Sequence, residues 1–105
     1  MQLVNLLTNK TTTGAGTTTS LLTKSHSHQC TGATTSGSGA SVVEIQVSND
    51  GTNFETLCTF TLTLSSTLSG DAQSFDAAIY KYIRAYVNSI SGTGANVSVT
   101  STLDL

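Results

Sequence analysis

The stretch Ser-His-Ser-His-Gln-Cys, residues 25–30, brings together the side chains of this sequence that are best suited to binding a metal ion. In an extended strand, His26, His28 and Cys30 lie on one face with about 6.6 Å between successive members. That spacing brings them within reach of a shared zinc ion. A zinc site needs further ligands, and the sequence has no Cys-x-x-Cys and no separated His pair to complete the set. We therefore expect a polar strand face here, with a bound metal as the alternative.

Serine and threonine are too abundant to identify a nucleophile, because the chain has 20 threonines and 15 serines among its 105 residues. The sequence contains no Gly-x-Ser-x-Gly turn of the kind that exposes a catalytic serine. Its six acidic residues are scattered, so no pair of carboxylates stands out for acid–base chemistry. We expect the protein not to be an enzyme and to use no cofactor.

The segment Tyr-Lys-Tyr-Ile-Arg-Ala-Tyr, residues 80–86, gathers all three tyrosines of the chain around one arginine. Strand geometry puts Tyr80, Tyr82, Arg84 and Tyr86 on one face. Tyr and Arg are among the residues that most often anchor protein interfaces. Tyr82, Arg84 and Tyr86 are therefore candidate partner-interface residues. Two alternatives stay open: a loop covers this face, or the aromatic rings stack on sugars.

A second candidate interface lies near the start of the chain, where Gln2–Leu7 is rich in leucine. Leu3, Leu6 and Leu7 would be costly to leave exposed in a monomer. We expect them to enter the core or to cover a neighbouring subunit. Leu3 and Leu6 therefore join the candidate interface residues.

Residues 48–54, Ser-Asn-Asp-Gly-Thr-Asn-Phe, separate two alternating apolar stretches. Asn-Asp-Gly supplies residues that tolerate positive φ, so we expect this stretch to close a hairpin. Asn49, Asp50, Asn53 and Glu55 also offer oxygen ligands, but the stretch is shorter than the roughly twelve-residue loop of an EF-type calcium site. A plain turn is the preferred interpretation, and a calcium site is the alternative.

Alternation of apolar and polar residues predicts β-strands throughout the chain. Strands are expected at Gln2–Leu7, Thr17–Thr23, His26–Thr31, Ser41–Ser48, Phe54–Leu64, Ser74–Phe75, Tyr80–Asn88 and Asn96–Leu103. The expected core consists of Val43, Ile45, Val47, Phe60, Leu62, Ile83, Val87, Val97 and Val99. These features predict an all-β protein: one domain, residues 1–105, folded as a single antiparallel β-sandwich, jelly-roll-like, with about eight strands.

Two features of the chain admit another interpretation. Asp76–Tyr86 contains good helix formers, but its alternation and its β-branched and aromatic content favour a strand. The sequences Ser-Gly-Ser-Gly-Ala at 36–40 and Ser-Gly-Thr-Gly-Ala at 91–95 are nearly the same. We expect each to be a glycine turn that precedes a strand, because the glycine spacing fits neither a P-loop nor a dinucleotide fingerprint.

The charge and composition argue against several function classes. The formal net charge is −2, and the four basic residues are dispersed along the chain, so no stripe for binding nucleic acid is expected. No apolar run has the length of a membrane span, and the first residues lack the basic and apolar regions of a signal peptide. We therefore expect no membrane partner and synthesis in the host cytoplasm. Cys30 and Cys58 are expected to be free buried thiols, with one disulfide as the alternative.

Residues 43–62 and 80–100 together resemble a recurrent pattern in virion proteins of tailed bacteriophages. In that pattern a strand ends in Ser-x-Asp-Gly-x-Asn-aromatic, and a Tyr-x-Tyr-x-Arg-Ala strand follows later. Ser-Gly-Thr-Gly-Ala and a final strand complete it. Phe54 stands where such sequences often have tryptophan. The shared residues belong to turns and core, so the resemblance assigns no catalytic or ligand-binding residue.

The resemblance implies a small β-sandwich component of the virion. We expect a capsid decoration (cement) protein that binds the major capsid protein or another virion protein and stabilises the head shell. It would act as a homo-oligomer, with a trimer favoured. A tail, neck or fibre component is the alternative within this class. A carbohydrate-binding module that uses Tyr80, Tyr82 and Tyr86 is the alternative from another class.

Overall fold

The computed structural model describes residues 2–21 and 23–104. The strands along the chain are β1 (Gln2–Lys10), β2 (Gly14–Ala15), β3 (Thr19–Ser20), β4 (His26–Ala33), β5 (Ser36–Ser48), β6 (Glu55–Leu64), β7 (Ser69–Phe75), β8 (Tyr82–Thr93) and β9 (Asn96–Leu103). No helix occurs among these described residues. The strand interpretation of Asp76–Tyr86 is therefore confirmed from Tyr82 onward, and residues 76–81 form the loop that leads into β8.

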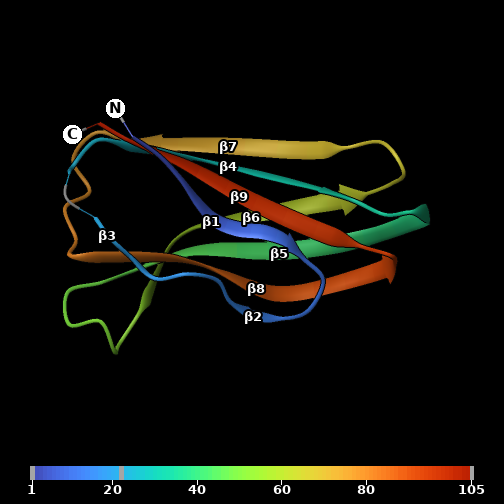
Figure 1. Cartoon of the computed structure of the whole chain (residues 1–105), viewed down its shortest axis with the longest axis horizontal. Coiled ribbons are helices and arrows are strands. Elements are labelled where there is room, and N and C mark those ends of the chain that lie inside the picture. Colours follow the sequence, from blue (N-terminus) through green and yellow to red (C-terminus); the bar gives the residue numbers. More distant parts are fainter. Residues whose placement is uncertain (1, 22, 105) are drawn as a thin grey trace.

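The strands form two antiparallel sheets (Figure 1). Sheet A has the order β1-β9-β4-β7, and sheet B has the order β2-β8-β5-β6, with β3 also paired to β8. Gly14–Ala15 lies opposite residues 86–87, and Thr19–Ser20 lies opposite residues 82–83 of the same strand. β2 and β3 therefore act as one interrupted strand beside β8.

The pairing of the strands is nested. The first strand pairs with the last, β2 and β3 pair with β8, β4 pairs with β7, and β5 pairs with β6. One long antiparallel hairpin that folds over on itself produces this order, and it is the arrangement of a jelly roll. The predicted jelly-roll sandwich is confirmed.

The core lies between the inner faces of the two sheets. All nine residues predicted for the core are buried: Val43, Ile45, Val47, Phe60, Leu62, Ile83, Val87, Val97 and Val99. Threonine occupies the outward positions of β6, where Thr59, Thr61 and Thr63 are exposed. A β-branched side chain with a hydroxyl suits an exposed strand position, so these strands face water without needing charge.

Only β9 has the predicted bounds; β1, β4 and β8 extend further toward the C-terminus than expected, β6 and β8 begin later, and β2 was not predicted. The largest differences lie in β3, β5 and β7. β5 begins at Ser36, five residues earlier than expected, and β3 is confined to Thr19–Ser20. Leu22, within the expected strand Thr17–Thr23, lies outside the described residues. β7 extends from Ser69, because its backbone pairs fully with β4 while most of its side chains face solvent. A strand with so few buried side chains has no apolar alternation from which its length could be predicted.

The two glycine-rich repeats are largely paired strand ends, which corrects their interpretation as separate turns. Ser36 lies opposite Thr93 and Ala40 lies opposite Ser91, so the start of β5 runs beside the end of β8. Gly39 permits this close approach, because a Cβ atom at this position would collide with the backbone carbonyl oxygen of Ser91.

Replacing Gly39 by alanine should weaken the pairing of β5 with β8, because the added methyl group meets backbone and not a movable side chain. We expect the free energy of unfolding to fall by about 2 kcal/mol or more. Gly37→Ala is the matched control: a Cβ there meets nothing within 4 Å, although φ is 69°. Its expected cost is about 1 kcal/mol, from the positive φ alone. Urea denaturation measures both variants, and equal losses would contradict this interpretation of the approach.

Ser41 and Ser48 are both buried on β5 but differ in hydrogen bonding. Within the described part of the chain, Oγ of Ser41 has no hydrogen-bond partner, whereas Oγ of Ser48 accepts from the backbone N–H of Gly51 at 2.9 Å. Ser41→Ala should raise the free energy of unfolding by up to about 1 kcal/mol, and Ser48→Ala should lower it by about the same amount. Thermal unfolding of the two variants shows whether their free energies of unfolding change in opposite directions. A destabilised Ser41→Ala protein would show that the Ser41 hydroxyl has a hydrogen-bond partner.

Candidate partner interface

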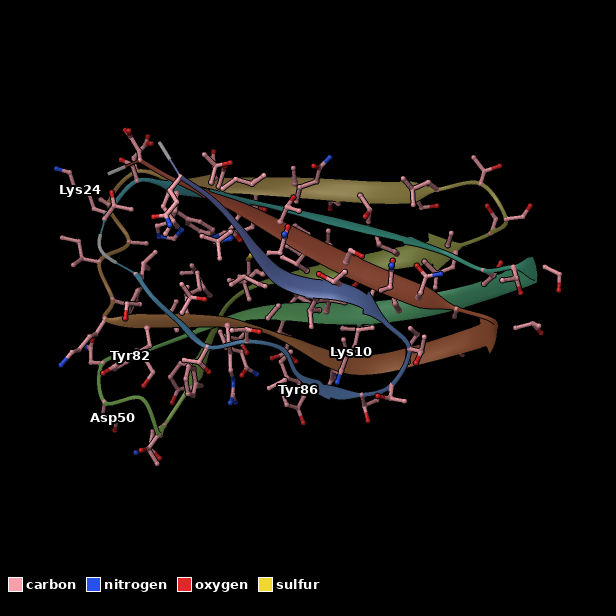
Figure 2. All side chains as sticks on the ribbon, viewed as in Figure 1. Lys10, Lys24, Asp50, Tyr82 and Tyr86 are labelled. Carbon is pink, nitrogen blue, oxygen red and sulfur yellow. The ribbon has the colours of Figure 1, made fainter. Side chains whose placement is uncertain are left out.

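The candidate interface lies on the outward face of sheet B. Buried and half-buried residues alternate along β8, and Tyr82, Arg84 and Tyr86 are the half-buried ones that point outward. β5 places Gln46 opposite Arg84 and Glu44 opposite Tyr86. Figure 2 shows Tyr82 toward the end of the molecule that carries the β5–β6 loop, with Tyr86 further along the strand. The three residues share one face of β8, as predicted, and their role as a partner interface stays a prediction.

Arg84 is held in one orientation by two aromatic rings and a hydrogen bond. Its guanidinium carbon lies 3.9 Å from the centre of the Phe54 ring and 5.6 Å from that of Tyr86. Its Nε donates to Oε1 of Gln46 at 2.8 Å. Cation–π attraction at such exposed sites contributes about 0.5–1 kcal/mol. A side chain that is already ordered loses less entropy when a partner binds. We name Phe54, Arg84 and Tyr86 the Arg84 cluster.

Glu44 anchors the polar side chains beside the Arg84 cluster. Oε1 of Glu44 accepts from Nε2 of Gln46 at 3.2 Å and from the hydroxyl of Thr56 at 2.6 Å. Gln46 links β5 to β8 through Arg84, and Glu44 links β5 to β6 through Thr56, so the side chains connect three neighbouring strands. This network fixes the outward face of sheet B around the arginine.

Tyr80 does not belong to this face, which corrects the prediction of a four-residue strip. β8 begins at Tyr82, and the half-buried Tyr80 packs against the hydrophobic core from the preceding loop. Tyr82 is partly covered, because its ring lies 3.2 Å from the position that a Cβ on Gly51 would occupy. Lys81 adds a cation 5.7 Å from the centre of the same ring.

Phe54 is the member of the cluster that sequence reasoning missed. The sequence marks it only as an aromatic residue beside the turn, yet its ring lies closer to the Arg84 guanidinium than that of Tyr86. The two residues belong to different hairpin units, and only the pairing of β5 with both β6 and β8 brings them together. The signal in the sequence was an aromatic residue immediately before a strand, which in an antiparallel sheet can lie beside the start of a neighbouring strand such as β8.

The leucines near the start of the chain divide between core and surface. Leu6 is only 1 % exposed, so its assignment to a partner interface is wrong. A register shift between Asn5 and Leu7 in β1 allows Leu6 and the adjacent Leu7 both to be buried. Leu3 is 68 % exposed and stays available to a partner.

The β5–β6 loop is a self-contained turn. Oδ1 of Asp50 accepts from the backbone N–H groups of Asn53 and Thr52, both at 2.8 Å, and from the hydroxyl of Ser48 at 2.9 Å. These bonds, those from Asn53 and Thr52 first, hold the pKa of the Asp50 carboxyl well below its ordinary value. Gly51 has φ of 78°, as the turn interpretation requires. Both carboxylate oxygens of Asp50 already accept hydrogen bonds within the loop, so the structure favours the plain turn.

His26 and His28 form a buried chain of hydrogen bonds instead of a polar outer face, which corrects the prediction for this strand. Nδ1 of His26 lies 2.7 Å from Nε2 of His28. Nε2 of His26 lies 3.0 Å from the carbonyl of Ala78, and Nδ1 of His28 lies 2.6 Å from Oγ of Ser101. The carbonyl of Ala78 can only accept, so with neutral rings each Nε2 donates and each Nδ1 accepts. These hydrogen bonds join β4 to β9 and to the loop before β8.

This histidine geometry is that of a hydrogen bond and not of a metal centre. Two nitrogens on one tetrahedral zinc ion lie about 3.3 Å apart, whereas the ring nitrogens are separated by 2.7 Å. In residues 2–21 and 23–104, no group of three His, Cys, Asp or Glu side chains is arranged to hold a metal ion. Ser101 accompanies the pair but is 1 % exposed, and a substrate would have no access to its hydroxyl.

Both cysteines are free thiols in the structure, in agreement with the preferred expectation. Burial raises the pKa of Cys30 to about 12, and the nearby Asp71 and Cys58 add to the rise. Burial likewise raises the pKa of Cys58 to about 11. Both thiols are therefore protonated and weakly nucleophilic at neutral pH.

A pocket of about 560 Å³ opens between three loops, next to the N-terminal end of β8. Leu21 and Tyr80 form part of its wall, together with Lys24 and Lys81. Two backbone hydrogen bonds join two of these loops, from Leu21 N–H to the carbonyl of Lys81 at 2.9 Å and from Ala78 N–H to that of Lys24 at 3.3 Å. The pocket is therefore a preformed recess at the edge of the candidate interface.

Stability should depend on pH through His28. Burial, and then repulsion from His26, lower the pKa of His28 from 6.5 to about 4. Below pH 6.5, His28 in the unfolded chain binds a proton, whereas the buried ring in the native protein stays neutral until the pH approaches about 4. The stabilisation is complete above pH 6.5 and is lost as the pH falls toward about 4, by at most about 3 kcal/mol.

Urea unfolding between about pH 7 and pH 4 tests this dependence. The Asp50 contribution titrates below this window, because its pKa is lowered from 3.8. A His28→Gln variant should lose most of the slope, whereas Lys24→Ala should keep it. An unchanged slope in His28→Gln would assign the pH dependence to other groups.

Within the described residues, no helix is long and apolar enough to cross a membrane. Comparison of the sequence and structure with protein families, curated proteins and solved structures finds no match.

Proposed function

We propose that the protein is a structural component of a bacteriophage virion, and specifically a capsid decoration protein that binds and stabilises the head shell. The observation that carries the proposal is the Arg84 cluster, an ordered arginine stacked on aromatic rings on a sheet face otherwise rich in hydroxyl groups. Tyr and Arg dominate the binding energy of many protein interfaces. The jelly roll adds support of a weaker kind, because viral capsid proteins, lectins and cupins all use this fold.

The composition of the surface also suits a contact with a protein lattice. The chain has ten charged residues among 105, so its partner contacts must rest mainly on apolar, aromatic and hydroxyl groups. A shell presents the same site many times, and modest affinity for each copy then gives high occupancy if oligomers bridge several sites. We assign the protein no catalytic step, and the major capsid protein is its proposed partner.

A sugar-binding role has less support from the geometry. Carbohydrate rings stack on the open faces of aromatic side chains, but Arg84 covers Phe54 and Gly51 approaches the ring of Tyr82. Tyr80, the third tyrosine of the suggested strip, packs toward the core. Decoration of the head is therefore preferred over the sugar module, and tail, neck or fibre placement stays as the alternative within the virion.

The test is association with particles of the phage that encodes the chain. Quantitative mass spectrometry of purified virions should find hundreds of copies per particle for a head protein, whereas a handful would indicate the neck or a fibre. Absence from the particles, together with binding on a glycan array, would replace the proposal with the sugar module.

The contact itself is tested by two variants that each remove one positive charge. Arg84→Ala should reduce occupancy on protein-stripped particles by about tenfold or more, because a stacked arginine at an interface is a typical hot spot. Lys10→Ala, on β1 of the other sheet, is the control and should bind normally. Wild-type association should change little between low and molar salt, since screening acts mainly on exposed charges. Equal occupancy of the two variants would exclude the Arg84 cluster as the contact.

A further inference from the structure

The four sheet edges of the sandwich differ in how they are protected against pairing with another chain. Protein edges are normally protected by short strands, bulges or charged residues. β1 has register shifts between Asn5 and Leu7 and between Leu7 and Lys10. β2 and β3 are two residues each, and β7 carries Asp71 as the third of its seven residues. Three of the edges are thus protected by these devices.

The edge formed by β6 lacks them over most of its length. The pairings of Ile45 with Cys58 and of Gln46 with Thr56 leave Leu57 as an extra residue, so a bulge disturbs only the first part of the strand. From Cys58 to Leu64 the sequence Cys-Thr-Phe-Thr-Leu-Thr-Leu has no charge and no proline. β6 and β7 diverge from their connecting loop, so β7 does not run along this edge (Figure 1).

The direction of the free backbone groups on β6 follows from one hydrogen bond. Oγ of Ser69, at the start of β7, donates to the carbonyl of Thr63 at 3.0 Å. That carbonyl therefore points away from β5, toward the open edge. Backbone groups of residues two apart point to the same side in an antiparallel strand, so Thr59 and Thr61 also present their N–H and C=O groups outward.

We propose that β6 pairs antiparallel with β6 of a second copy of the chain, around a two-fold axis at Thr61. This register places Thr61 opposite Thr61 and Thr59 opposite Thr63, which are the residues whose backbone groups face outward. The same register sets threonine against threonine on the outer face and Phe60 against Leu62 on the inner face. The hydroxyl of Ser69 gives up its bond to Thr63 when the partner strand binds.

The occupant is a second copy because this segment is complementary to itself. Threonine and apolar residues alternate in the same order on both sides of Thr61, so two antiparallel copies place threonine opposite threonine. Cross-strand Thr–Thr pairs are favourable. No like charges meet, and the net charge of −2 gives little repulsion between copies. Pairing of identical strands around a two-fold axis closes at two copies, so it predicts a dimer in place of the trimer favoured from the sequence. This inference does not depend on the virion role.

Charge reversal across the two-fold axis tests the proposal. Wild-type protein should sediment as a dimer at submillimolar concentration. Thr61→Lys and Thr61→Glu should each raise the dimer dissociation constant by about tenfold or more, because each places like charges opposite each other. An equal mixture of the two variants should restore the dimer, since opposite charges then meet at the axis. Gln73→Lys, on the exposed edge strand β7, adds the same charge elsewhere and should stay dimeric.

Hydrogen exchange separates the predicted register from other dimers. The backbone amides of Thr59 and Thr61 should exchange slowly in the wild type and rapidly in folded Thr61→Lys monomers, whose circular dichroism serves as the check on folding. A monomeric or trimeric wild type would overturn the proposal. Dimers that survive Thr61→Lys, or a mixture of the charge variants that fails to associate, would also overturn it.

Discussion

The antiparallel pairing of β5 with β8 is the contact on which the outward surface of sheet B depends. The two strands are joined along most of their length, although they are separated in sequence by two other strands. Their register places Gln46 beside Arg84, and β6 on the other side of β5 brings Phe54 and Thr56 to the same area. The close approach at Gly39 extends this pairing to the far end of the sheet. Without this register, the arginine would have neither its hydrogen bond to Gln46 nor its contact with the Phe54 ring.

A shortage of charge sets the character of the exterior. Threonine and serine occupy many of the outward positions, where their hydroxyl groups keep the strands compatible with water, and the β-branching of threonine favours extended backbone. Hydroxyl groups repel neither one another nor a second chain. The same composition that makes the surface soluble therefore leaves β6 open to pairing, whereas a lysine or glutamate within the strand would have protected it.

Polar residues in the interior are used to connect elements. His26 and His28 lie on the inner face of β4 and carry a continuous set of hydrogen bonds from Ala78 to Ser101. Buried imidazoles are tolerated because every ring nitrogen has a partner. The loop that contains Ala78 also contributes to the pocket beside β8, so the buried pair helps to hold one wall of that recess. The chain of bonds links the interior of sheet A to the loop end where the candidate interface begins.

The fold class, the core and the turn at residues 48–54 can be predicted from the amino-acid sequence, because they depend on local alternation and on residues suited to positive φ. The sequence also identified Tyr82, Arg84 and Tyr86 as one face of a strand. Tertiary structure alone decided that Tyr80 and Leu6 turn inward, that the histidines are buried, and that Phe54 supports Arg84. Each of these outcomes depends on strand register, on a bulge or on contacts between elements far apart in the chain. Alternation tells which residues share a face, but which face is covered, and by what, is settled only when the strands pair.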